Sequence, residues 1–176
     1  MRIHWNSRWC RDDGQSLLET AILTPFLLSI AFNAINIAYF WFMVLVLSTA
    51  PRQGVEYSSQ GGAALTTTTS PSSSAVKDVV YDNLTHTING TVSNASVQVC
   101  SVANGVDTTS HKANCTTYGP SFAFPSPDAD PEAPVFVLHR VDVAYQVSPL
   151  IPGAAFHVLL PANMTFHRQV SMRSLY

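Results

Sequence analysis

The chain has 176 residues and a formal net charge of −2, and only 11% of its residues are charged. This length is typical of one small domain with an attachment segment. Soluble domains carry about a quarter of charged residues, so an ordinary soluble protein is disfavoured. No basic cluster or stripe occurs, which excludes a nucleic-acid partner. The charges are also unevenly distributed, since residues 20–51 contain no Asp, Glu, Lys or Arg.

A polar leader, residues 1–14, precedes the apolar part of the chain. Arg2, Arg8 and Arg11 lie in this leader, whereas residues 45–51 contain no Lys or Arg. The positive-inside rule therefore predicts a cytoplasmic N-terminus and an extracytoplasmic C-terminal part.

Residues 15–60 are predicted to form a single-pass transmembrane helix with a short stub beyond it. A membrane span needs about 20 apolar residues, and so small a chain has too little protein to surround such a helix as a core element. A cleaved secretory signal, with an apolar region of about 7–15 residues, is the less favoured alternative. Pro25 is predicted to bend the helix because it removes a backbone hydrogen bond, and Pro51 interrupts the pattern again.

Two asparagines and an aromatic cluster lie in the second half of this predicted helix. Asn33 and Asn36 are three residues apart and hence on one face, where they would bond either to a neighbouring helix or to their own helix and water. The aromatic residues 39–42 suit a membrane interface. From Leu17 to Trp41 a helix extends roughly 36 Å, which matches a slightly tilted span.

A linker and a small extracytoplasmic domain are predicted to follow. Residues 61–74 form a low-complexity linker rich in Gly, Thr and Ser, and residues 75–176 form the domain. Ser74 is expected to cap a helix over residues 75–87. One face of that helix is apolar, carrying Val76, Val79, Val80 and Leu84.

The second half of the domain is predicted to contain an antiparallel sheet. Residues 91–102 alternate in part, and residues 164–172 alternate with a bulge near Gln169 and Val170. The strongest strand is 135–147, with Val141, Val143, Tyr145 and Val147 on one face and Arg140, Asp142 and Gln146 on the other. It should pair with 164–172, while the proline-rich stretch 118–134 forms an irregular loop. The fold class is therefore α+β.

The three cysteines are divided by the membrane segment. Cys10 precedes it, whereas Cys100 and Cys115 follow it and lie on the oxidising side. A Cys100–Cys115 disulfide is predicted, closing a loop of about 15 residues and contributing roughly 3 kcal/mol. The alternative is a pair of free thiols in a chain that meets no oxidant.

Signals for chemistry are weak throughout the chain. The six histidines lack metal-ligand spacing, no serine lies in a nucleophile-elbow pattern, and no glycine-rich phosphate loop occurs. The acids Asp128, Asp130 and Glu132 would bind calcium weakly at most, and a solvated loop is the favoured interpretation. We therefore expect no enzymatic activity, no cofactor and no metal site.

The most informative pattern lies between Arg11 and Pro25. A charged head ends at Gly14, and Glu19 follows five residues later as the last charge before the long apolar run. An acid near the start of a membrane-length helix is costly and indicates a functional site. Together with Ala21 and Pro25, this arrangement resembles the N-terminal part of TadE-like proteins. These are the minor pseudopilins of bacterial tight-adherence (Flp) pilus systems, with a type IV pilin-like processing site.

The resemblance implies that a prepilin peptidase cleaves between Gly14 and Gln15, and that Glu19 then faces the new α-amino group of a neighbouring subunit. It implies a non-enzymatic protein of the bacterial inner membrane that supports assembly of Flp-type pili for adhesion. Its partners would be other pilin and pseudopilin subunits, pilus assembly proteins and the lipid bilayer.

Two features favour a minor pseudopilin over the main subunit of the filament. Thr20 follows Glu19 where the major Flp pilins have Tyr, and a long chain follows the membrane segment. The alternative function is a single-pass membrane-anchored binding domain unrelated to pili, in which Glu19 is a chance acid near the lipid headgroups.

Overall fold

The computed structural model describes residues 12–59, 70–87, 90–133, 135–153, 160 and 163–175. The chain divides into two compact units. The first combines Met1–Tyr39 with Pro149–Ala162, and the second combines Phe40–Ser148 with Asn163–Tyr176. Helix α1 (Asp12–Ser59) contributes residues to both.

The predicted long helix is confirmed, but its boundaries differ from expectation. α1 begins at Asp12, so the leader that was expected to end at Gly14 contributes to its first turn. A first turn tolerates polar residues and glycine because its N–H groups need no helical partner. α1 also runs through Pro51, which is buried. A proline removes only one helical hydrogen bond, and the buried neighbours Leu47, Ala50 and Val55 hold the helix there.

Most of the apolar surface of α1 is uncovered. From Gly14 to Ser59 the helix is long and apolar enough to cross a membrane, and only 28% of its most apolar 18-residue window is buried. In the first unit, the large side chains of Leu17, Ile22 and Phe26 are more than half exposed. The helix is continuous at Pro25, and the bend expected there remains a prediction.

Helix α2 (Ser73–Thr85) begins inside the stretch expected to be linker; of that linker, residues 61–69 lie outside the described residues. Its N-cap is Ser72 rather than Ser74, because Ser72 has an extended backbone and its hydroxyl accepts a hydrogen bond from the amide of Ala75. The expected apolar face is confirmed by the complete burial of Val76, Val80 and Leu84.

Four antiparallel strands form the main sheet, in the order β4-β1-β5-β6. They are β1 (Ala95–Cys100), β4 (Cys115–Tyr118), β5 (Phe136–Val147) and β6 (Met164–Leu175). The short strands β2 (Val106–Asp107) and β3 (Lys112–Ala113) pair separately, and 3-10 turns lie at η1 (Val92–Asn94) and η2 (Val102–Asn104). The expected strand at 91–102 is therefore shorter, because its first part forms η1.

The predicted pairing of the two longest strands is confirmed. Phe136 lies opposite Leu175 at one end of the β5–β6 ladder, and Val147 lies opposite Met164 at the other. The register is unbroken between them, so the bulge expected near Gln169 and Val170 is wrong. Gln169 is exposed and Val170 is half-buried, so the two residues alternate regularly across β6.

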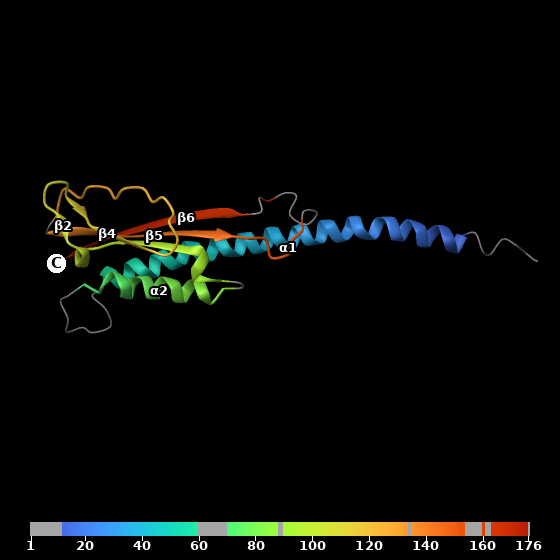
Figure 1. Ribbon diagram of the computed structural model, residues 1–176, viewed down its shortest axis with the longest axis horizontal. Helices are drawn as coiled ribbons and strands as arrows, with labels where there is room; N and C mark the ends of the chain where they lie inside the picture. Colours follow the sequence, from blue (N-terminus) through green and yellow to red (C-terminus); the bar gives the residue numbers. More distant parts are fainter. Residues whose placement is uncertain are drawn as a thin grey trace, which may run out of the picture. The chain divides into compact units, whose positions relative to one another are not determined.

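One face of the sheet is covered by helices. In Figure 1 the later part of α1 and the green helix α2 lie on one side of the strands, with the yellow-to-orange loop on the other. Helix and sheet approach closely at Gly54 of α1, where an added Cβ would lie 2.6 Å from a methyl of Val80 and 3.5 Å from one of Val141. The core there includes Val97, Val99 and Val143, all completely buried.

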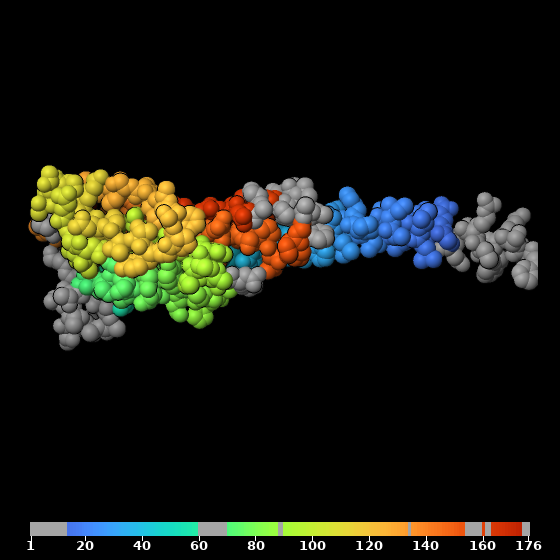
Figure 2. Space-filling model, viewed as in Figure 1, coloured from blue at the N-terminus to red at the C-terminus, as the bar shows by residue number. Residues whose placement is uncertain are grey.

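The other face of β5 carries the polar side chains that the alternation predicted, but two of them are buried. Arg140 is 2% exposed and Asp142 is completely buried. Residues 119–133 form the predicted irregular loop, and backbone carbonyls of this loop bind Arg140. The atoms of this loop form a continuous surface on the face viewed in Figure 2. Strand β5 is consequently buried on both sides although its sequence alternates.

Candidate functional site

The residues of the predicted processing site lie in the first turns of α1 and are exposed. An added Cβ at Gly14 meets no atom within 4 Å, so this glycine is not required by packing in the fold. Gln15 and Glu19 lie one turn apart on the same helix face, and the side-chain amide of Gln15 donates to Glu19 over 3.4 Å. Among the described residues, no cation forms an ion pair with Glu19.

The helical start has a consequence for proteolysis. Because α1 begins at Asp12, the bond between Gly14 and Gln15 lies within the first helical turn. A protease binds its substrate bond in an accessible backbone conformation, so any cleavage here would require this turn to unwind. Unwinding here breaks few hydrogen bonds, since the first helical N–H groups have no partner within the helix, and glycine favours the unwound state by about 1 kcal/mol relative to alanine.

Polar side chains further along α1 satisfy their hydrogen bonds within the first unit. Thr24 donates to the carbonyl of Thr20, and Asn33 donates to that of Ser29 at 2.8 Å. Asn36 is completely buried and makes two bonds to Ile151: its amide group donates to the carbonyl at 3.1 Å and accepts from the N–H at 2.9 Å. Thus Asn33 binds its own helix, whereas Asn36 holds the loop around Ile151, a contact that no local pattern indicates.

The predicted disulfide is present. Cys100 ends β1 and lies directly opposite Cys115, the first residue of β4, and their sulfur atoms are bonded. Cys100 is buried in a small apolar cluster with Ala113 and Val137. The bond therefore joins a central strand to an edge strand at one end of the sheet. Cys10 lies outside the described residues.

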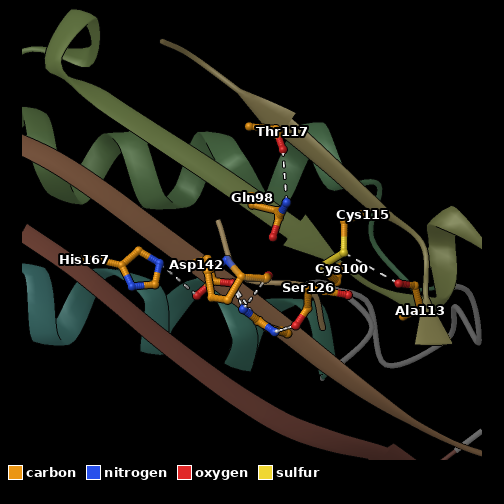
Figure 3. A network of polar contacts seen from close by, with 10 residues as sticks. Gln98, Cys100, Ala113, Cys115, Thr117, Ser126, Asp142 and His167 are labelled. Carbon is orange, nitrogen blue, oxygen red and sulfur yellow. Dashed lines mark hydrogen bonds and ion pairs between the residues drawn. A yellow bond between two sulfur atoms is a disulfide. The ribbon is translucent and has the colours of Figure 1, made fainter. Parts of the chain in front are cut away.

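A buried ion pair fastens the loop of residues 119–133 to the sheet. Arg140 contacts Asp142 at 2.5–2.6 Å, and its Nη2 and Nη1 groups donate to the carbonyls of Pro125 and Ser126. His167 approaches the same carboxylate at 3.5 Å (Figure 3). Burial raises the pKa of Asp142, against the opposing attraction of Arg140. This network holds the loop in place.

Two acidic residues of the loop share a structural partner. Arg173 of β6 contacts Asp130 at 3.4 Å and Glu132 at 3.0 Å. Asp130 is 4% exposed, so the solvated loop expected for it is wrong at this residue. In the part of the chain that the structure describes, no group of three His, Cys, Asp or Glu side chains is placed to hold a metal ion.

A second buried polar contact joins α1 to the sheet within the second unit. Nδ1 of His139, on β5, lies 2.6 Å from the hydroxyl of Ser58 near the end of α1. Burial lowers the pKa of His139 to about 4. The imidazole is therefore neutral at physiological pH, and the two groups form one neutral hydrogen bond inside the core.

The described residues of the second unit line at least two surface hollows. One, of about 450 Å³, is lined by Lys77 and Tyr81 of α2 and by Tyr118 of β4. The Lys77 ammonium lies 5.7 and 5.5 Å from the centres of the two tyrosine rings. The other, of about 400 Å³, lies between α1 and β6. Neither hollow was predicted from the sequence, because each combines residues from elements far apart in the chain.

Comparison of the chain with protein-family models, with curated proteins and with solved structures finds no significant match.

Proposed function

We propose that this protein is a TadE-like minor pseudopilin that supports assembly of Flp-type pili in the bacterial inner membrane. The observation that carries the proposal is the setting of Glu19. This acid is exposed, has no cation partner among the described residues and lies one turn from Gln15, at the head of an exposed apolar helix. A carboxylate in such a helix requires a partner beyond those residues when the helix enters lipid.

The Asn36 contact supports a membrane boundary near this residue. The loop at Ile151 has irregular backbone, and such backbone does not lie exposed to lipid in the hydrocarbon region. The loop binds α1 at Asn36, so the hydrocarbon region ends before that point. From Leu17 to Asn36 a helix rises roughly 28 Å, close to the hydrocarbon thickness of about 30 Å. Trp41 then lies at the headgroup level of the extracytoplasmic side, as interfacial tryptophans do.

Cleavage would supply the missing partner of Glu19. Removal of residues 1–14 leaves a charged α-amino group on Gln15, and the same group on a neighbouring subunit can pair with Glu19. At an effective dielectric constant of 20, two unit charges 4 Å apart attract by about 4 kcal/mol. Desolvation offsets much of this energy, so the pair acts mainly to set the axial register between subunits.

The cleavage step is tested by co-expressing the full chain with its prepilin peptidase and measuring the mature mass by mass spectrometry. We expect a product that begins at Gln15. Gly14→Ala fills empty space in the fold, so loss of cleavage in this variant reports recognition by the peptidase and not misfolding. A catalytically inactive peptidase is the matched control. An intact N-terminus beside the active peptidase would contradict the proposal.

The assembly step is tested with Glu19→Gln, which keeps the shape of the side chain and removes its charge. In the native host we expect normal membrane insertion, measured by alkaline extraction, and loss of surface pili, measured by electron microscopy. Glu19→Asp keeps the charge and should retain part of the function. Normal piliation of the Glu19→Gln strain would show that the carboxylate has no register role.

The second candidate function is a membrane-anchored binding domain unrelated to pili. The hollow between Lys77, Tyr81 and Tyr118 favours it, because aromatic side chains around a shallow site are typical of recognition surfaces. Tyr81→Ala and Tyr118→Ala would abolish function in this case while Glu19→Gln would not. The opposite pattern is expected for a pseudopilin.

A further inference from the structure

The hollow between α1 and β6 has an apolar floor and an open apolar wall. Leu47, which is 2% exposed, contributes to the floor. Trp41 and Leu45 contribute the wall on α1, and they are 68% and 53% exposed. Phe166 lines the opposite side and packs on Phe40, with ring centroids 6.2 Å apart. Large apolar side chains are therefore left uncovered beside a preformed hollow of about 400 Å³.

A cationic side chain borders this hollow. Arg168 lies two residues after Phe166 on β6, so both side chains are on the same face of the sheet, the face on which Phe166 meets α1. The other arginine of this strand, Arg173, is paired with Asp130 and Glu132. Arg168 forms no ion pair within the described residues, and its charge is available to a ligand.

We propose that this hollow binds the headgroup and glycerol backbone of an anionic phospholipid in the extracytoplasmic leaflet. The inference depends on membrane insertion of α1 and is independent of any role in pili. Three properties fit this ligand. Arg168 supplies the charge for a phosphodiester, Trp41 and Leu45 supply apolar surface for the glycerol carbons, and Trp41 is the residue that the expected span length puts at the headgroup level.

The positive charge of Arg168 favours an anionic lipid over other possible occupants of the hollow. A zwitterionic lipid offers the same glycerol backbone but no net charge to Arg168. A second copy of the chain would bring its own Arg168 close to the first in a symmetric contact, which is unfavourable. One basic residue near an anionic membrane surface gives about a fivefold preference for the anionic lipid. We expect enrichment of that size.

The test uses Trp41 as the reporter in the full chain. Trp5→Phe and Trp9→Phe leave Trp41 as the sole tryptophan. The protein is reconstituted into phosphatidylcholine vesicles that contain a minor fraction of phosphatidylglycerol. Either the phosphatidylglycerol or an equal amount of the phosphatidylcholine carries bromine near the headgroup, and quenching of Trp41 fluorescence is measured. Alkaline extraction checks insertion of every variant.

The expected result is stronger quenching by brominated phosphatidylglycerol, corresponding to about fivefold local enrichment. Arg168→Gln should reduce quenching to that of brominated phosphatidylcholine, whereas Arg173→Gln, a matched change on the same strand, should leave the preference intact. Equal quenching by the two lipids, or a preference that survives Arg168→Gln, would overturn the proposal. Quenching that changes with the protein-to-lipid ratio but is equal for the two brominated lipids would also overturn it, and would indicate that a second copy of the chain occupies the hollow. A chain that fails to insert would also overturn it, whereas loss of piliation with insertion intact would not.

Discussion

The two halves of α1 are similar in composition but differ in what covers them. Before Tyr39, Leu17 and Ile22 are 72% and 65% exposed, whereas after it Met43 and Leu47 are 0% and 2% exposed. Both halves present apolar side chains at helical spacing. Only the second half packs on a sheet within its own unit.

This difference shows that an apolar helix does not determine its own environment. Transfer of one large apolar side chain out of water contributes about 1.5–3 kcal/mol, so the second half stabilises the domain by packing. The apolar side chains of the first half remain exposed, so the chain does not gain this transfer free energy there. Soluble proteins rarely leave so large an apolar surface exposed. A bilayer or neighbouring helices would supply the missing cover.

The largest expected change in unfolding free energy comes from removing a buried charge, Asp142, in the second unit. Removing an exposed charge, Glu19, in the first unit should have little effect. Asp142→Ala leaves Arg140 buried without its partner, and we expect the domain to lose about 3–5 kcal/mol of unfolding free energy. Unfolding of the full chain in detergent, followed by near-ultraviolet circular dichroism, measures this loss. Glu19→Ala is the matched control and should change the same value by less than about 0.5 kcal/mol. The double change Arg140→Met with Asp142→Leu should recover much of the loss, because it removes both buried charges.

The second largest expected loss of unfolding free energy comes from removing the disulfide, which joins two strands of the sheet. Replacement of Cys100 and Cys115 by alanine should lower the unfolding free energy by roughly 3 kcal/mol. The measurement is thermal unfolding under oxidising conditions, with the chain under reducing conditions as a second comparison. Membrane insertion of α1 should be unchanged. Equal stability with and without the bond would show that the loop between β1 and β4 is already constrained in the unfolded chain.

The pH dependence of the His139 contact tests whether the second half of α1 is held by the core. Because the folded pKa of about 4 lies below the ordinary value of 6.5, the unfolded chain binds the proton more readily. The contribution of neutral His139 is therefore full above pH 6.5 and is lost as the pH falls from about 6.5 to about 4. The loss amounts to roughly 3 kcal/mol.

The experiment compares unfolding free energies across this pH range in the native chain and in His139→Gln. The variant removes the titrating group, so its stability should fall less steeply as the pH is lowered. Parallel curves for the two proteins would mean that other groups cause the acid sensitivity.

The smallest effect compares two glycines of the same helix. Gly54→Ala places a methyl group 2.6 Å from Val80, and we expect a loss of about 1–2 kcal/mol after the gain in helix propensity is subtracted. Gly14→Ala meets no atom within 4 Å and should leave the domain unchanged. Thermal unfolding of both variants measures the difference. A stabilising Gly54→Ala would indicate that α1 and α2 can separate slightly without cost.

Much of the fold could be predicted because its signals are local. The uncharged run of residues 20–51 predicts the long helix, the spacing of Val76, Val80 and Leu84 predicts the face of α2, and alternation predicts β5 and its pairing with β6. The disulfide also followed, from the position of Cys100 and Cys115 after the membrane segment. In the proposed site, Gly14, Gln15 and Glu19 come from a local sequence pattern and from its resemblance to the N-terminal part of TadE-like proteins.

Only the tertiary structure shows the contacts between residues that are far apart in the sequence. Alternation put Arg140 and Asp142 on one face of β5, but it did not show that the loop of residues 119–133 folds over that face and that its carbonyl groups accept hydrogen bonds from the arginine. Asn36 likewise forms hydrogen bonds with Ile151, and Trp41 lines the same hollow as Arg168. A periodicity in the sequence indicates only the secondary structure of its own segment. The burial of a given face depends on which distant segment covers it, and that choice is made by packing of the whole chain.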